Sequence, residues 1–159
     1  MDILLSRDLD SRFSAREVEA VQEWIETENK SIHAMRDNPA HNIGLLGASW
    51  GTDLTKDNAR GKWKKSWDQM LQDNETFAPR MEKGHDQMTL RRYVWHRWAL
   101  ASAVQHDSYL CDQYPGSIGF PTQRLLEPNN YVASVWNDRE TIQKKCPEKC
   151  RRHPDWLYC

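Results

Sequence analysis

The chain has 159 residues, a length that suits one domain. Its 22 lysines and arginines nearly balance its 23 aspartates and glutamates, so the formal net charge of -1 supplies no field for holding nucleic acid or an anionic membrane. No apolar run approaches the ~20 residues that a membrane-spanning helix needs, and the opening MDILL is too short and too acidic for a signal peptide.

Hydrophobic residues make up 38% of the chain, and its mean hydropathy is -0.88. These values predict a lean core, which eight tryptophans partly compensate because each ring buries a large area. A lean core in a chain that opens inside a strand leads us to expect a part of a larger protein.

The predicted elements alternate between strands and helices. A short buried strand at 3–6 precedes a helix at 14–28, which Ser14 and Glu17 open as a capping box. The elements that follow are a strand at 31–36, a glycine-punctuated stretch at 43–51, helices at 56–72 and 86–98, a polar junction at 104–108, a loop at 112–130 and a last strand at 131–135. We therefore expect an α/β fold, with a small mixed sheet, flanking helices and a Cys-bearing tail.

The cysteines predict an oxidising compartment. Cys146, Cys150 and Cys159 crowd the last fourteen residues, and Cys111 makes the count even, which is typical of a disulfide framework. Four cysteines allow three pairings, so the connectivity stays open. Two N-x-S/T sequons, which begin at Asn29 and Asn74, also fit passage through the secretory pathway.

The RDLDSR segment at 7–12 follows the first strand directly. Residues two apart in an extended segment point to the same side, so Asp8 and Asp10 would face one point while Leu9 faces the core. Paired carboxylates suit Mg²⁺ or Mn²⁺, with phosphate oxygens completing the shell, and Arg7 and Arg12 would add contacts to an anionic ligand. The alternative is a solvated turn or helix cap flanked by surface ion pairs.

Five polar segments follow one another along the chain: RDLDSR at 7–12, HAMRDNPAH at 33–41, GASWG at 47–51, DQMTL at 86–90 and HD at 106–107. In this order they resemble nucleotide-sugar glycosyltransferases of the A-type fold, most of all an uncharacterised branch with R-D-x-D-S-R and H-x-M-R-D-H-P-x-H segments. The resemblance covers most of residues 2–135. Asn38 departs from the family's histidine. The family places a nucleotide-binding half before its D-x-D, so we expect this chain to hold the C-terminal half of the fold, with an open sheet edge.

The resemblance implies a role for each matching residue. Asp8 and Asp10 would hold Mn²⁺ or Mg²⁺ against the donor diphosphate, with His106 as a further metal ligand. Asp86 would contact sugar hydroxyls and act as general base in an inverting enzyme. The residues implied to contact donor or substrate are Arg7, Arg12, Arg36, Asp37, His41, Gly47, Trp50, Gly51 and Gln87.

The implied activity is metal-dependent transfer of a sugar from a nucleoside-diphosphate donor to a glycan, protein or lipid acceptor. The implied location is the Golgi lumen, or outside the cell. Residues 1–140 would form the catalytic region, and residues 141–159 a disulfide-stapled tail.

Two other classes of protein remain as alternatives. One is a secreted, disulfide-stapled module without catalysis, which binds carbohydrate through its tryptophans and is indifferent to divalent metal. The other is a small zinc protein whose ligands are Cys146, Cys150, His153 and Cys159.

Overall fold

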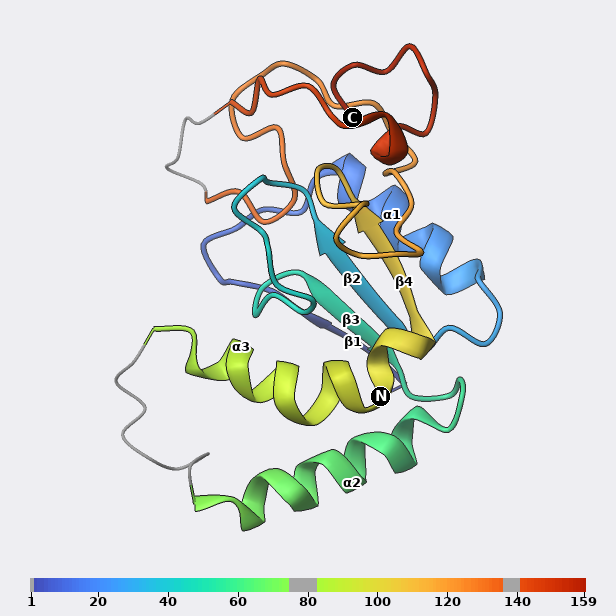
Figure 1. Ribbon diagram of the computed structural model, residues 1–159, viewed down its shortest axis with the longest axis vertical. Helices are drawn as coiled ribbons and strands as arrows, with labels where there is room; N and C mark the ends of the chain where they lie inside the picture. The colour runs from blue at the N-terminus through green and yellow to red at the C-terminus, as the bar shows by residue number, and fades with distance from the viewer. Residues whose placement is uncertain (1, 75–82, 136–140) are drawn as a thin grey trace.

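A computed structural model describes residues 2–74, 83–135 and 141–159 (Figure 1). It shows a mixed α/β architecture: a four-stranded mixed sheet, flanking helices and a C-terminal tail held by two disulfides. Within these residues, no helix is both long and apolar enough to cross a membrane.

The sheet has the strand order β1-β3-β2-β4. Its strands are β1 (Ile3–Ser6), β2 (Ile32–Arg36), β3 (Trp50–Asp53) and β4 (Ala103–Asp107). β3 runs antiparallel to both of its neighbours, whereas β2 and β4 are parallel. β1 forms an edge of the sheet, and its Ile3 and Leu4 side chains are exposed, so the predicted strand at 3–6 is confirmed in position but its predicted burial is wrong.

The last strand of the sheet is not the predicted one. Residues 131–135 form a turn, and only Val135 joins an isolated bridge, to Ser11. Ala133 has a φ of 65°, a left-handed conformation that interrupts an extended run. β4 instead comes from the predicted polar junction, because its buried polar side chains find partners across the sheet.

Three α-helices flank the sheet: α1 (Ala15–Glu26), α2 (Ala59–Gln72) and α3 (His85–Leu90). The Ser14 side chain accepts a hydrogen bond from the Glu17 amide, as the capping box predicts. The predicted helix at 86–98 is confirmed in position but not in type, because α3 continues as a π-helix, η2 (Arg91–Ala99), and then as a 3₁₀ turn, η3 (Leu100–Ser102).

Tryptophans fill much of the core between the sheet and the helices. Trp50 of β3 stacks on Trp63 of α2, and Trp63 meets Trp98 edge to face. Trp95 is buried beside them, in the same core cluster as Ile32. Large rings therefore supply the buried area that a low aliphatic content would leave missing.

The C-terminal tail is bound to the rest of the chain at several points. Cys111 pairs with Cys150, in the 3₁₀ turn η4 (Glu148–Cys150), and Cys146 pairs with Cys159. The zinc alternative is wrong, because the sulfurs of all four cysteines are in disulfides and offer no thiolate ligand. The two disulfides fit a secreted protein or one of the secretory pathway.

Candidate functional site

The Asp8 and Asp10 carboxylates lie in a turn after β1. The Ser11 amide and hydroxyl both donate to the Asp8 carbonyl, at 3.3 and 3.1 Å, so the chain reverses direction there. The prediction of an extended segment with Leu9 facing the core is therefore wrong, since Leu9 is fully exposed. Asp and Ser favour such turns because their side chains bond to nearby backbone. Both carboxylates remain exposed to solvent.

Arg7 holds this turn against the rest of the molecule. Its guanidinium donates to the Arg12 carbonyl at 3.2 Å, which closes the segment, and to the Ala48 carbonyl at 3.2 Å, which ties it to the loop before β3. The same guanidinium lies 3.0 Å from the Glu17 carboxylate. Arg7 thus connects the Asp-x-Asp turn to α1 and to the glycine-bearing loop.

Glu17 is a buried carboxylate directly behind the turn. Burial raises the pKa of Glu17 from 4.5 to about 7, while the charge of Arg7 and the Ser14 amide oppose that rise. Sequence reasoning treated Glu17 only as part of a helix cap. No spacing pattern could have shown that its carboxylate meets Arg7, because the contact depends on how α1 packs against the end of β1.

The start of α3 meets the glycine-bearing loop beside the end of β1. The Ser6 hydroxyl donates to the Gly47 carbonyl at 2.5 Å. A Cβ on Gly47 would lie only 2.7 Å from an Asp86 carboxylate oxygen and 3.9 Å from Gln87, so the lack of a side chain lets the exposed Asp86 approach the loop. The end of β1, the loop before β3 and the start of α3 therefore lie side by side at one end of the strands (Figure 1).

We call this convergence the strand-end site. It comprises Arg7, Asp8, Asp10, Gly47, Asp86 and Gln87. These six belong to the residues that the sequence analysis selected, and the structure gathers them from positions up to 80 residues apart along the chain. Arg12 is exposed at the end of the Asp-x-Asp turn and contributes its carbonyl to Arg7.

Arg36, predicted to line the donor site, is instead enclosed beneath it. Its guanidinium donates to Asp107 at 2.6 Å and to the Gln105 side chain at 2.8 Å, and lies 3.9 Å from the centre of the Tyr114 ring. It also donates to the Gly44 carbonyl at 2.9 Å. In this structure, Arg36 positions the loop and has no exposure for a ligand.

Asp37 is likewise enclosed. Arg16 meets its carboxylate through two nitrogens, at 2.8 and 3.0 Å, and Arg124 and Ser108 donate to the same group. Burial alone would raise the pKa of Asp37, but Arg16 and Arg124 outweigh it and hold the pKa below its usual value. We call Arg16, Arg36, Asp37, Asp107, Ser108 and Arg124 the buried network.

His106, predicted as a metal ligand, has both ring nitrogens engaged. Its Nδ1 lies 2.8 Å from Nε2 of His33, and its Nε2 lies 3.2 Å from the Glu23 carboxylate. Burial lowers the pKa of His106 although Glu23 opposes it, so the ring is neutral and donates to Glu23. In this arrangement no lone pair of His106 is left for a metal ion.

Trp50, Gly51 and His41 also serve packing in this structure. Trp50 is buried on Trp63, and a Cβ on Gly51 would lie 2.8 Å from Leu5, so both residues belong to the interior of the sheet. His41 is half-buried, with its ring edge toward Tyr131, and burial lowers its pKa. Among the described residues, none of the three contacts a residue of the strand-end site.

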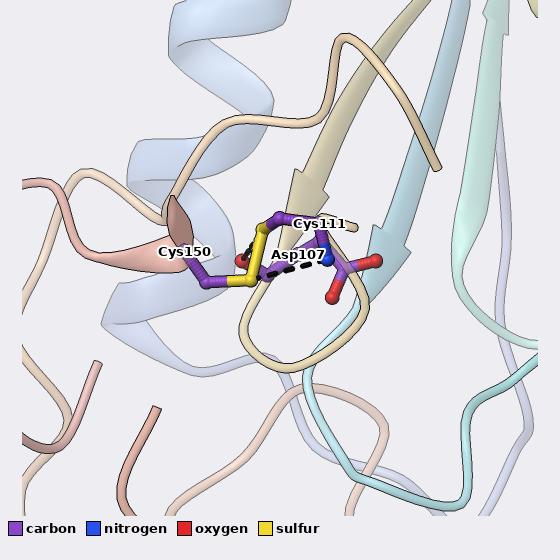
Figure 2. Close-up of side chains that lie close together, drawn as sticks. All are labelled: Asp107, Cys111 and Cys150. Atoms are coloured by element: carbon purple, nitrogen blue, oxygen red, sulfur yellow. Dashed lines mark hydrogen bonds between the residues drawn. A yellow bond between two sulfur atoms is a disulfide. The ribbon is translucent and has the colours of Figure 1, made fainter. Parts of the chain in front are cut away.

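Asp8 and Asp10 are exposed and make no ion pair with another described residue, and no third potential metal ligand of the described residues gathers with them. Among the described residues, one group of three potential ligands gathers elsewhere: Asp107, Cys111 and Cys150 (Figure 2). That group does not fit a metal. Its two sulfurs form a disulfide, and Arg36 and the amides of residues 109 and 110 saturate the Asp107 carboxylate.

Comparison with known proteins adds no family to this geometry. No protein-family model matches the chain, and neither the curated proteins nor the solved structures give a match.

Proposed function

We propose that this chain carries the metal-binding and acceptor-side part of a glycosyltransferase that uses a nucleotide-sugar donor in the Golgi lumen. The observation that carries the proposal is the strand-end site. Exposed Asp8 and Asp10 stand at the end of β1, and Asp86 approaches the same edge over Gly47. Ligand sites in open α/β sheets gather at strand ends of this kind.

The buried surroundings support the proposal by keeping this edge rigid. Arg7 fixes the Asp-x-Asp turn to the loop at Ala48, and Arg36 fixes the same loop at Gly44. A site that must orient two substrates gains from such preorganisation, because side chains on a fixed backbone need no reordering during the reaction.

Asp8 and Asp10 would hold Mn²⁺ or Mg²⁺. A bound cation of this kind neutralises charge on a leaving nucleoside diphosphate. The chain's own contribution is positional: Arg7 orients the turn, and Asp86 orients the acceptor. As the acceptor oxygen bonds to the anomeric carbon and the bond from that carbon to the diphosphate breaks, the Asp86 carboxylate would take the hydroxyl proton.

Calorimetric titration with Mn²⁺, with and without a panel of nucleoside diphosphates, tests the proposal. We expect the wild type to bind Mn²⁺ more tightly when a nucleotide is present, and Asp8→Ala/Asp10→Ala to lose that binding. The matched control is Asp112→Ala/Asp155→Ala, which removes two exposed carboxylates of the C-terminal half. Absence of binding in the wild type, or equal loss in the control, would overturn the proposal.

A secreted binding module without catalysis is the second candidate. The two disulfides favour it, since small secreted modules use such crosslinks to supplement a lean core. An exposed tryptophan, Trp67, offers a ring for a sugar face. This candidate requires that carbohydrate binding be unchanged by a chelator, which calorimetric titration with a panel of glycans in the presence and absence of EDTA decides.

A further inference from the structure

A cavity of about 210 Å³ borders the loop that also forms the strand-end site. Besides Ile43, the side chains that line it are polar or aromatic and come from three segments: Asn42, Arg91, Trp95, His96, Gln113 and Tyr114. Gly44, in the same loop as Gly47, lies against its inner wall and contacts Trp95. Arg91 follows Asp86 by five residues, or about 7.5 Å along a helix axis, so the cavity is a neighbour of the proposed site.

The walls of this cavity are fixed from beneath. The Tyr114 hydroxyl donates to the Asn42 carbonyl at 2.7 Å, and the Tyr114 and Trp95 rings meet edge to face. Behind them, the buried Arg36 packs on Tyr114 and holds the Gly44 carbonyl. The cavity is therefore a built feature of the fold and not a gap between mobile side chains.

The π-helix places two basic side chains at the mouth of the cavity. Residues five apart on an α-helix point about 140° away from each other, whereas the wider π-helix brings them to one side. Arg91 and His96 are five apart in η2, and Arg91 Nε donates to His96 Nε2 at 3.2 Å. π-helical turns are rare, and they are frequently found at functional sites.

The mouth of the cavity offers mainly hydrogen-bond donors. Arg91 uses Nε on His96, and its two terminal nitrogens bond to no other residue in the described parts of the chain. His96 accepts at Nε2, so a neutral ring carries its proton on Nδ1. Gln113 adds an amide. None of the described lining residues is acidic, so an anion would meet donors without repulsion.

We propose that this cavity binds a sugar unit that carries an oxyanion, either a carboxylate or a sulfate ester, as part of the acceptor. The inference that the ligand is an anion depends only on the hydrogen-bond donors of the cavity. The inference that this anion belongs to an acceptor sugar rests on the proposed function. The volume lies below the roughly 300–1,000 Å³ of sites for drug-sized ligands, which suits one ring and not a longer chain.

Nuclear magnetic resonance titration of the ¹⁵N-labelled protein, without metal or nucleotide, tests this inference. The probes are methyl glucuronide, glucose 6-sulfate, the neutral methyl glucoside and inorganic sulfate. We expect at least one of the acidic sugars to bind about tenfold more tightly than methyl glucoside, because a charge-assisted contact is worth about that factor. Which acidic sugar binds distinguishes a carboxylate from a sulfate ligand.

Arg91→Gln should weaken binding of the acidic sugar about tenfold. Arg97→Gln is the matched control, because Arg97 is an exposed cation of the same π-helix that does not line the cavity. Equal binding of methyl glucoside, equal loss in both variants, or inorganic sulfate binding as tightly as the acidic sugars would overturn the inference. Asp8→Ala/Asp10→Ala should bind the acidic sugar like the wild type, so failure of the metal site stays distinguishable from failure of this one.

Discussion

The strand-end site and the buried network are made of the same kinds of side chain, in opposite states. In the strand-end site, the carboxylates of Asp8, Asp10 and Asp86 reach solvent and retain the capacity to bind. In the buried network, arginines, hydroxyls and amides enclose Asp37 and Asp107 and donate to their carboxylate oxygens, so these oxygens are not available to a ligand. The difference teaches that a polar cluster becomes a candidate site only where its partners leave lone pairs unoccupied.

The buried network should give the largest effect on stability. Asp37→Asn removes the charge that compensates Arg16 and Arg124, and we expect the free energy of unfolding to fall by about 3–5 kcal/mol. Urea denaturation followed by tryptophan fluorescence measures it. The control is Asp112→Asn, whose exposed pair with Lys149 should be worth less than about 0.5 kcal/mol. A similarly small loss of unfolding free energy in both variants would show that the buried network does not contribute more to stability than an exposed ion pair.

The disulfides should come next. The Cys111–Cys150 crosslink spans 39 residues and the Cys146–Cys159 crosslink spans 13, so chain entropy predicts losses of about 4 and 3 kcal/mol when each pair is changed to serine. The second pair also holds the Cys159 carbonyl against Arg16. Thermal unfolding of the two double variants measures both losses, and a reversed order would show that this carbonyl contact outweighs loop length.

Glu17, which pairs with Arg7 of the strand-end site, should give a smaller, pH-dependent effect. Its pKa is raised in the folded state to about 7, so its neutral form stabilises the fold at low pH, and that stability is lost as the pH rises from about 4.5 through 7. Glu17→Gln should therefore raise the unfolding free energy at pH 8 by about 1–2 kcal/mol, discounted for screening, and change it little at pH 4.

The exposed Glu19→Gln, on the same helix, serves as the control for this pH dependence and should show no such difference. Denaturation of both variants at several pH values gives the comparison. A Glu17→Gln variant that loses stability equally at every pH would mean that the ion pair with Arg7 dominates over burial.

The strand-end carboxylates should give the smallest effect on stability. Asp8→Ala/Asp10→Ala removes exposed groups without a described ion pair, so we expect the free energy of unfolding to change by less than about 0.5 kcal/mol. Thermal unfolding checks this alongside the metal titration. A large loss would show that these carboxylates stabilise the turn. The strand-end site and the buried network would then no longer differ in their contribution to stability.

The sequence was sufficient for the elements with a clear local signal. The capping box at Ser14 and Glu17, the strands that became β1 and β2, and the α2 helix all carry such signals. β4 lacked one, because Gln105, His106 and Asp107 look like a loop until their partners on β2 and elsewhere are known. The π-helical turns were hidden for a similar reason, since their register depends on packing.

Among the candidate residues, the sequence could name chemistry but not exposure. Arg36 and Asp37 are adjacent in a polar motif, and both are buried in ion pairs with residues more than 20 positions away. His106 is likewise buried against residues distant in the sequence, because its ring nitrogens face His33 and Glu23. By contrast, Gly47 and Asp86 meet because a glycine in the loop leaves room for the carboxylate, a contact that the sequence did not predict.

The partners of the buried network are synthesised at different times, so the network can form only late in translation. Asp37 needs Arg124 and Ser108 before its charge is compensated, and Arg16 also awaits the Cys159 carbonyl. At a synthesis rate of roughly 5–20 residues per second, the interval between residue 37 and residue 159 is roughly 6–24 s. During that interval we expect the Asp37 and Arg16 side chains to remain hydrated, because the buried partners that compensate their charges have not all been synthesised.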